Sequence, residues 1–167
     1  KAEQTLIWRE GDVWCRARLD WLHEDHSAID DLKTTAAPAN PDVWTRTVYG
    51  AGYDVQAGFY LRGLRAIGGE REIMFRFVVQ ENYAPFALSV IGLGPDAAVL
   101  AEKKVLYAIE QWGACLEANR WPGYPTRTCW AELPGWEEAR WLEREMRPVL
   151  DDGRPIGEQL AGMGDVR

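Results

Sequence analysis

The chain has 167 residues, of which 47% are hydrophobic and 27% charged, and its formal net charge at pH 7 is −7. This length suits one domain with a sizeable core, and this composition excludes a disordered chain. No apolar run approaches the ~20 residues of a membrane-spanning helix, and the first residues lack a signal-peptide core. We therefore expect a cytoplasmic protein that does not contact a membrane.

The first part of the chain alternates between apolar and polar residues with the period of β-strands. Residues 5–9 and 13–22 show this pattern, and Gly11 and Asp12 between them are typical of a hairpin turn. The polar residues 23–26 predict a second turn, and residues 28–34 a further strand. We expect these strands to lie side by side and antiparallel.

The rest of the chain combines helices with further strands. Apolar residues at helical spacing and Pro, Asn or Gly near the ends indicate helices, whereas β-branched and aromatic runs indicate strands. The predicted helices are 43–48, 53–67, 95–119 and 136–147, and the predicted strands are 73–79 and 87–91. We expect an α/β fold with helices flanking a central mixed β-sheet. One domain would span residues 1–147, followed by a loosely ordered acidic tail over 148–167.

Acidic residues and a lysine carry the candidate chemistry. Asp31 and Lys33 are two apart in a predicted strand and share a face, while Leu32 points to the opposite side. Antiparallel pairing brings Asp20 close to them. Carboxylates hold Mg²⁺, and an ammonium stabilises the extra charge of a phosphodiester transition state. Alone, a D-x-K pattern is more often a surface ion pair, and Asp30 has a supporting or solvated role.

Segments of the chain together resemble the motif series of the RecB-like PD-(D/E)XK nucleases. They are Arg18-Leu19-Asp20-Trp21, then Asp31-Leu32-Lys33-Thr34-Thr35, and then Tyr53-Asp54-Val55-Gln56-Ala57-Gly58-Phe59-Tyr60. The nuclease domain of exodeoxyribonuclease VIII and related phage exonucleases are the closest match. The resemblance covers residues 3–141, including the Trp-Pro-Gly-Tyr of 121–124. It implies a core like that of restriction endonucleases.

The resemblance implies a role for each matching residue. The implied catalytic residues are Asp20, Asp31, Lys33, Gln56 and Tyr60, and the implied metal ligands are Asp20, Asp31 and the Leu32 carbonyl. Gln56 and Tyr60 lie at i and i+4 of a predicted helix, from which they would reach the scissile or terminal phosphate. Without the upstream motif they would be a polar helix face with an interfacial tyrosine. Glu3 matches an acid that some relatives place on the preceding strand.

The resemblance also implies a function. It implies a Mg²⁺-dependent DNA exonuclease, with Mn²⁺ as an alternative metal, that digests double-stranded ends 5′ to 3′ in recombination, repair or phage-type replication. A homo-oligomeric ring and a single-strand annealing protein are the implied partners besides DNA. Many RecB-like nucleases also use a His on an upstream helix, so we expect either a helical segment upstream of Lys1 or an incomplete activity. A structure-specific endonuclease and a non-catalytic DNA-binding or assembly module derived from a nuclease stay open.

Other residues are candidates for DNA contact. Trp21 and Trp44 lie near the motif and are candidates for base stacking, although packing is the commoner use of tryptophan. His23 and His26 are interpreted as solvated turn residues. The net charge of −7 argues against a DNA partner, an objection that bound divalent cations would weaken. Candidate phosphate contacts, each also explicable as a solvated or ion-paired arginine, are Arg16, Arg18, Arg46, Arg62 and Arg65.

Overall fold

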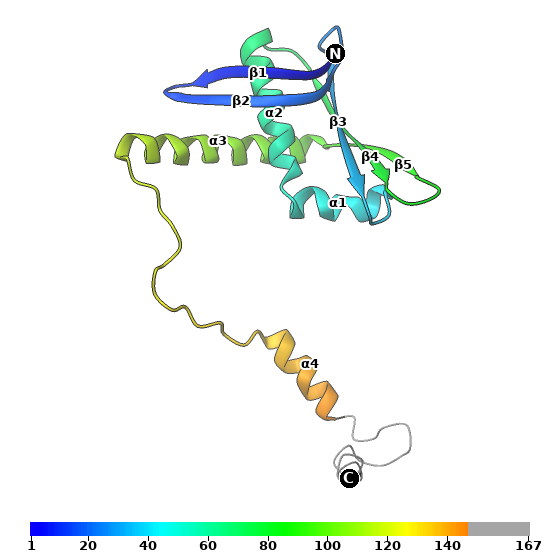
Figure 1. Cartoon of the computed structure of the whole chain (residues 1–167), viewed down its shortest axis with the longest axis vertical. Coiled ribbons are helices and arrows are strands. Elements are labelled where there is room, and N and C mark those ends of the chain that lie inside the picture. The colour runs from blue at the N-terminus through cyan, green and yellow to red at the C-terminus, as the bar shows by residue number, and fades with distance from the viewer. Residues whose placement is uncertain (147–167) are drawn as a thin grey trace, which may run out of the picture. The chain divides into compact units, whose positions relative to one another are not determined.

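The computed structural model describes residues 1–146 of the chain (Figure 1). The elements in chain order are β1 (Ala2–Glu10), β2 (Val13–Leu22), β3 (Ala28–Thr35), α1 (Pro41–Gly50), α2 (Tyr53–Gly68), β4 (Met74–Glu81), β5 (Leu88–Gly92), α3 (Pro95–Ala118) and α4 (Gly135–Glu145). Each predicted strand and helix is confirmed, with its ends shifted by a few residues at most. The tail predicted over 148–167 and the last residue of the final predicted helix lie outside the described residues.

The chain divides into two compact units. The first, residues 1–121, contains the sheet and α1 to α3, and the second begins at Pro122 and contains α4. Large apolar side chains of α4, among them Trp136, Trp141 and Leu142, are exposed. Within residues 1–146, no helix has both the length and the apolar character that crossing a membrane requires.

The strands form one mixed sheet in the order β1-β2-β3-β4-β5. The first three pair antiparallel in sequence, as predicted, whereas β3 and β4 run parallel and β5 is antiparallel to β4. A parallel pair needs a long crossover connection, and α1 and α2 supply it between β3 and β4. The register of β2 on β3 joins Trp21 to Asp30 and Leu22 to Ile29, at the end of β2. The two strands separate beyond these pairs.

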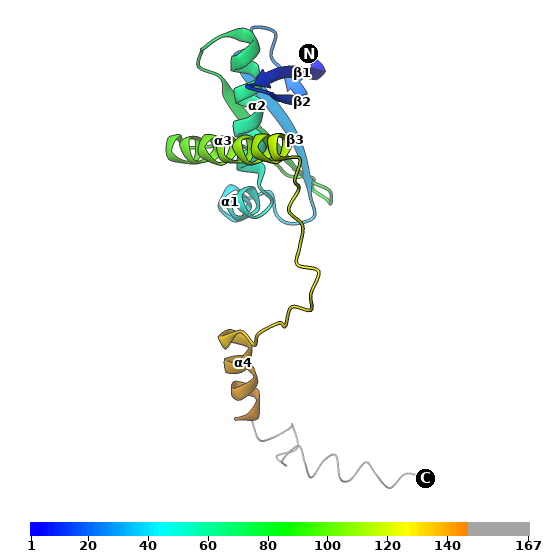
Figure 2. The same cartoon turned by 90° about the vertical axis from the view of Figure 1, so that its left-hand side faces the viewer.

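Helix α2 packs on β1 and β2 with one side and on α3 with another. Its buried residues include Ala57, Leu61 and Leu64, which recur at helical spacing. Figure 2 shows α1, α2 and α3 on the same side of the strands. Gly63 lets the ring of Trp8 approach the helix backbone, because a Cβ at this position would lie 2.6 Å from the nearest ring carbon.

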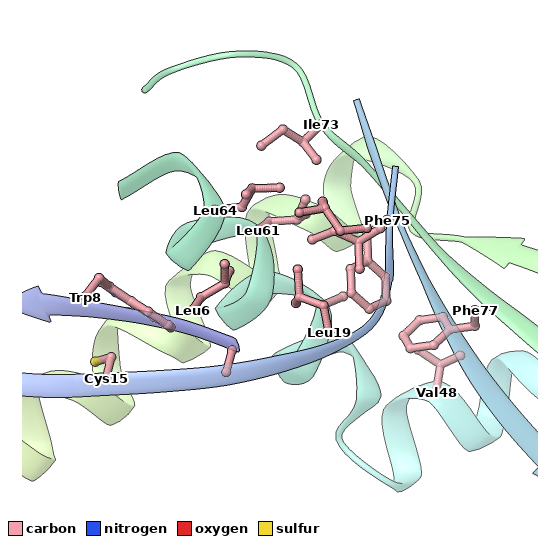
Figure 3. Close-up of a cluster of buried hydrophobic side chains, with 14 of the residues drawn as sticks. Leu6, Trp8, Cys15, Leu19, Val48, Leu61, Leu64, Ile73, Phe75 and Phe77 are labelled. Carbon is pink, nitrogen blue, oxygen red and sulfur yellow. The ribbon is translucent and has the colours of Figure 1, made fainter. Parts of the chain in front are cut away.

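The hydrophobic core lies between the sheet and these helices (Figure 3). Leu19 of β2 and Phe77 of β4 are fully buried, and the rings of Phe75 and Phe77 meet edge to face with centroids 5.0 Å apart. Burying a side chain of this size contributes ~1.5–3 kcal/mol. Strands fixed by such a core hold the side chains at their ends in defined positions.

Candidate active site

The candidate site lies where β2 and β3 separate. Burial in β2 alternates from Val13 to Leu19 and then breaks, since the next buried residue is Leu22. Asp20 and Trp21 therefore turn away from the core. Glu3 of β1 lies beside Asp20 of β2. Its φ of 55° falls in the left-handed region that a regular strand avoids.

The side chain of Asp20 connects the two strands. Its Oδ2 accepts a hydrogen bond from the backbone N–H of Leu32 at 2.9 Å. The N–H and C=O of one strand residue point toward the same neighbouring strand, so the Leu32 carbonyl also projects toward β2. The Asp20 carboxylate and the Leu32 backbone thus meet at the opening of the sheet, close enough to Asp31 for the charge of Asp20 to raise the pKa of its carboxyl.

Asp31 is the centre of a row of polar contacts. Its side chain is only 2% exposed. Lys33 Nζ donates to Asp31 Oδ2, and Gln56 Nε2 donates to Asp31 Oδ1 at 2.6 Å. Asp31 and Lys33 share a face, as their spacing predicts, and α2 brings Gln56 to them from a distant part of the chain. Both oxygens of the Asp31 carboxylate are therefore held in one orientation.

The surroundings of Asp31 disfavour its charge. Burial raises the pKa of the Asp31 carboxyl, the hydrogen bond and charge of Lys33 lower it, and repulsion from Asp20 raises it. The net result is a pKa above the ordinary value of 3.8. The two carboxylates thus carry more negative charge than Lys33 offsets, and a bound cation would relieve this repulsion.

Asp20, Asp31 and the Leu32 carbonyl could together hold one Mg²⁺ or Mn²⁺. Mg²⁺ at phosphate sites is commonly held by one or two carboxylates, with water and substrate oxygens completing its octahedron. Each carboxylate oxygen has two lone pairs, so the bonds from Lys33 and Gln56 leave acceptor capacity on Asp31. Within residues 1–146, no group of three or more His, Cys, Asp or Glu side chains could hold a metal ion, so this candidate centre relies on two carboxylates and a backbone carbonyl.

The other residue predicted beside Gln56 lies against the core. Tyr60 is partly buried, and its ring meets Phe75 edge-on with centroids 6.2 Å apart. Ala57 and Leu61 of α2 are buried in the core, and Gln56 and Tyr60, each one position before them, are partly buried. The contact of the Tyr60 hydroxyl with a phosphate stays a prediction.

The two tryptophans proposed for base stacking differ in exposure. Trp44 is 2% exposed and stacks on Tyr53 with ring centroids 5.6 Å apart. The proposal that Trp44 stacks on a DNA base is therefore wrong. Trp44 and Val48 form the buried face of α1, which packs into the core. Trp21 is 49% exposed and lines, with Asp20 and Leu32, an open cavity of about 470 Å³. Base stacking on Trp21 stays a prediction.

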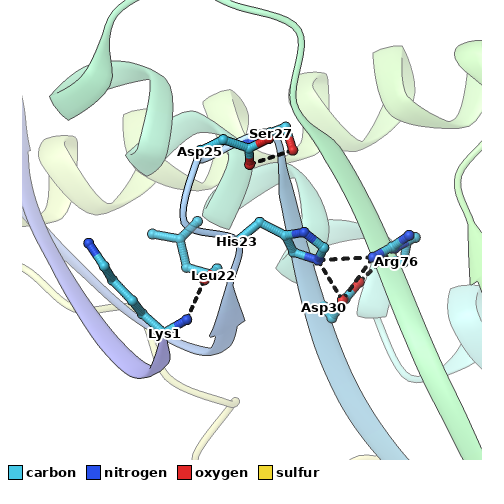
Figure 4. Close-up of polar contacts among 7 residues, drawn as sticks. All are labelled: Lys1, Leu22, His23, Asp25, Ser27, Asp30 and Arg76. Atoms are coloured by element: carbon cyan, nitrogen blue, oxygen red, sulfur yellow. Dashed lines mark hydrogen bonds and ion pairs between the residues drawn. The ribbon is translucent and has the colours of Figure 1, made fainter.

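The interpretation of His23 as a solvated turn residue is also wrong, because its ring contacts Asp30 and Arg76 (Figure 4). Its Nε2 lies 2.9 Å from Asp30 Oδ2 and 3.0 Å from Arg76 Nη2. Burial raises the pKa of the Asp30 carboxyl, but hydrogen bonds from Arg76 and His23 outweigh this and hold it below its usual value. The parallel pairing of β4 with β3, which sequence periodicity does not reveal, brings Arg76 to this position. Asp30 thus ties β3 to β4 beside Asp31.

Most of the candidate arginines are paired with acids. Arg62 Nε donates to Glu10 Oε1 at 2.7 Å, and Arg62 also bonds Glu102. Arg65 lies 3.9 Å from Glu102, and Arg18 pairs with Glu3. The ion-paired alternative is therefore the one that these three arginines adopt. Phosphate contacts of the exposed Arg16 and Arg46 stay predictions.

Tyr53 is a neighbour of the site that sequence patterns did not single out. Its ring centroid lies 4.8 Å from Lys33 Nζ. The available signal is its position three residues before Gln56, which places both side chains on neighbouring parts of one helix face.

Comparisons with known proteins bear on the family and the fold of the chain. The family model described as a PDDEXK-like domain of unknown function (DUF3799) matches residues 2–131. Among solved structures, a protein from Eubacterium rectale described as a putative exonuclease matches with a TM-score of 0.60 at 14% sequence identity. The match covers 83% of this chain and 56% of that one, so the chain spans little more than half of its length. None of the curated proteins compared with the chain matches it.

Proposed function

The chain belongs to the PDDEXK-like domain family DUF3799, and on this premise we propose that it is a metal-dependent DNA nuclease centred on Asp20, Asp31 and Lys33. The observation that carries the proposal is the buried Asp31 carboxylate, held by Lys33 and Gln56 beside Asp20. Burying an ionised carboxylate next to a second acid lowers the stability of the folded protein, as the raised pKa of Asp31 indicates. Such groups are typical of functional sites.

The chemistry assigned to the chain's own groups follows from their positions. Asp20, Asp31 and the Leu32 carbonyl would hold Mg²⁺ or Mn²⁺, which polarises the phosphate and lowers the pKa of water when bound. The Lys33 ammonium, anchored on Asp31, offsets the negative charge that develops on the phosphate oxygens. Gln56 keeps the Asp31 carboxylate in the orientation needed for metal binding.

Exonuclease action on double-stranded ends, with 5′ to 3′ polarity and a role in recombination, repair or phage-type replication, is the finer form of the proposal. It is supported by the resemblance to exodeoxyribonuclease VIII and by the fold shared with the Eubacterium rectale protein. A ring of identical chains and a single-strand annealing protein are the proposed partners besides DNA. A structure-specific endonuclease of the same superfamily is the main rival, because the same metal centre would serve both.

The test compares linear with covalently closed circular DNA in Mg²⁺, in Mn²⁺ and in EDTA. The proposal predicts metal-dependent loss of linear DNA only, and nicking of the closed circle would favour the endonuclease. Asp31→Asn should abolish cleavage without lowering the melting temperature in EDTA, because the ionised carboxylate is unfavourable in the fold. Gln111→Leu, at an exposed position of α3, is a surface control that should cleave normally. Equal cleavage by wild type and Asp31→Asn would refute the active centre.

A further inference from the structure

The ammonium of Lys33 rests on an aromatic surface as well as on Asp31. Lys33 Nζ lies 4.8 Å from the ring centroid of Tyr53 and 5.9 Å from that of Phe77. Both distances lie within the ~6 Å over which a ring face attracts a cation. The Lys33 side chain is 16% exposed, so little water competes with this attraction. Lys33 therefore has an anionic partner and an uncharged partner at the same time.

The ring of Tyr53 is itself held in place. It stacks on the buried Trp44 with an interplanar angle of 19°, and its centroid lies 5.9 Å from that of Phe77. Trp44 in turn contacts Phe77 with centroids 5.7 Å apart. We call Tyr53, Trp44 and Phe77 the aromatic seat. Its members come from α2, α1 and β4, so the seat forms only in the folded protein.

The two partners of Lys33 differ in one respect that matters for catalysis. Asp31 Oδ2 is bonded to Lys33, yet the same carboxylate is the proposed metal ligand. A cation bound there would repel the ammonium and compete for Asp31. The face of an aromatic ring attracts the ammonium whether or not Asp31 is engaged elsewhere. Tyr53 can thus keep Lys33 near the active centre when Asp31 cannot.

We propose that Tyr53 is a positioning residue that holds the Lys33 ammonium over the active centre through its ring face. This inference rests on the proposed nuclease function for its kinetic consequence, but the contact itself does not depend on that function. Tyr53 acts through the quadrupole of its ring rather than through its hydroxyl. Phenylalanine at this position should therefore serve, and an aliphatic side chain of similar size should not.

The first experiment measures the contact without cleavage. Amine acetylation of the folded protein is followed at each lysine by mass spectrometry, in EDTA and in Mg²⁺. Tyr53→Leu should raise the acetylation rate of Lys33 several-fold, with the larger increase in Mg²⁺, whereas Tyr53→Phe should match wild type. Tyr49→Leu is the matched control, because the ring of Tyr49 lies 5.8 Å from Lys104 Nζ instead. That variant should leave the Lys33 rate unchanged.

The second experiment measures hydrolysis of linear DNA. Tyr53→Leu should lower kcat about tenfold, the loss expected for one partly buried cation–π contact, with KM unchanged, and Tyr53→Phe should restore kcat. Fluorinated phenylalanines at position 53 keep the shape of the ring while weakening its quadrupole. They should raise Lys33 acetylation in step with fluorine content, which tests the contact even if Tyr53→Leu does not fold.

The outcomes separate the two proposals. If Lys33 acetylation is unchanged in Tyr53→Leu, if Tyr53→Phe behaves like Tyr53→Leu, or if fluorination has no effect, the positioning role is overturned. A wild-type protein that cleaves no DNA with either metal refutes the nuclease proposal, while the acetylation result still decides whether Tyr53 holds Lys33. Changes in melting temperature alone, with Lys33 acetylation as in wild type, would return Tyr53 to a packing role.

Discussion

Replacing Gln56 with Leu isolates one contact of the candidate active centre. Gln56 Nε2 donates to Asp31 Oδ1 at 2.6 Å, and the Asp31 carboxylate is almost fully buried. A hydrogen bond to a charged group contributes about 1.5–3 kcal/mol. If all of it is lost in the transition state, kcat falls about 10- to 160-fold, since 1.36 kcal/mol corresponds to a factor of about ten. Leucine keeps much of the volume, so packing around α2 is largely preserved.

The Gln56→Leu substitution should also change the pH dependence of cleavage. The hydrogen bond from Gln56 lowers the pKa of the Asp31 carboxyl, so its loss raises that pKa further. A metal ligand must be ionised, and cleavage should therefore fail at a higher pH in Gln56→Leu than in wild type as the solution is acidified. The assay is the pH profile of linear DNA hydrolysis, with melting temperatures in EDTA.

Two controls make the Gln56 experiment specific. Gln111→Leu makes the same chemical change on the exposed side of α3 and should cleave normally. Val55→Ala should lower the melting temperature more than the cleavage rate, since Val55 lines an apolar pocket with Phe59. Wild-type kcat and an unshifted acid limb in Gln56→Leu would refute the role assigned to this glutamine.

Three further predictions follow from other contacts. Lys33→Ala should lower turnover by ~10²-fold with the fold intact, and Lys33→Arg should rescue poorly because a planar fork does not replace a point charge. Near-normal turnover in Lys33→Ala would reduce Lys33 to a structural ion pair with Asp31. Gly63→Ala should lower the free energy of unfolding by about 1–2 kcal/mol, measured by urea denaturation. The added Cβ would lie 2.6 Å from the Trp8 ring, and this clash outweighs the higher helix propensity of alanine. The hydrogen bond from Arg62 holds the pKa of Glu10 below 4.5, so this pair stabilises the fold above that pH and less as the pH falls. The loss of stability in Glu10→Gln should therefore shrink below pH 4.5, and a stability difference from wild type that does not change with pH would contradict the pairing.

The positions of the strands and helices were predictable because their signals are local. Alternation in 13–22 and 28–34, and the apolar spacing of Ala57, Leu61 and Leu64, reflect which face of each element meets the core. The shared face of Asp31 and Lys33 has the same origin, since a strand repeats every two residues. Antiparallel pairing of β2 with β3 was predictable in the same way, and it underlies the prediction that Asp20 lies near Asp31.

Contacts between distant segments required the tertiary structure. Periodicity does not show that α2 delivers Gln56 to Asp31, that Trp44 is buried behind Tyr53, or that Arg76 reaches His23 across a parallel strand pair. These contacts depend on the crossover between β3 and β4 and on how α1 and α2 pack. The local sequence pattern around each side chain is compatible with more than one contact partner. The sequence alone therefore determined which residues carry the charge at the opening of the sheet, whereas packing decided what holds each of them in place.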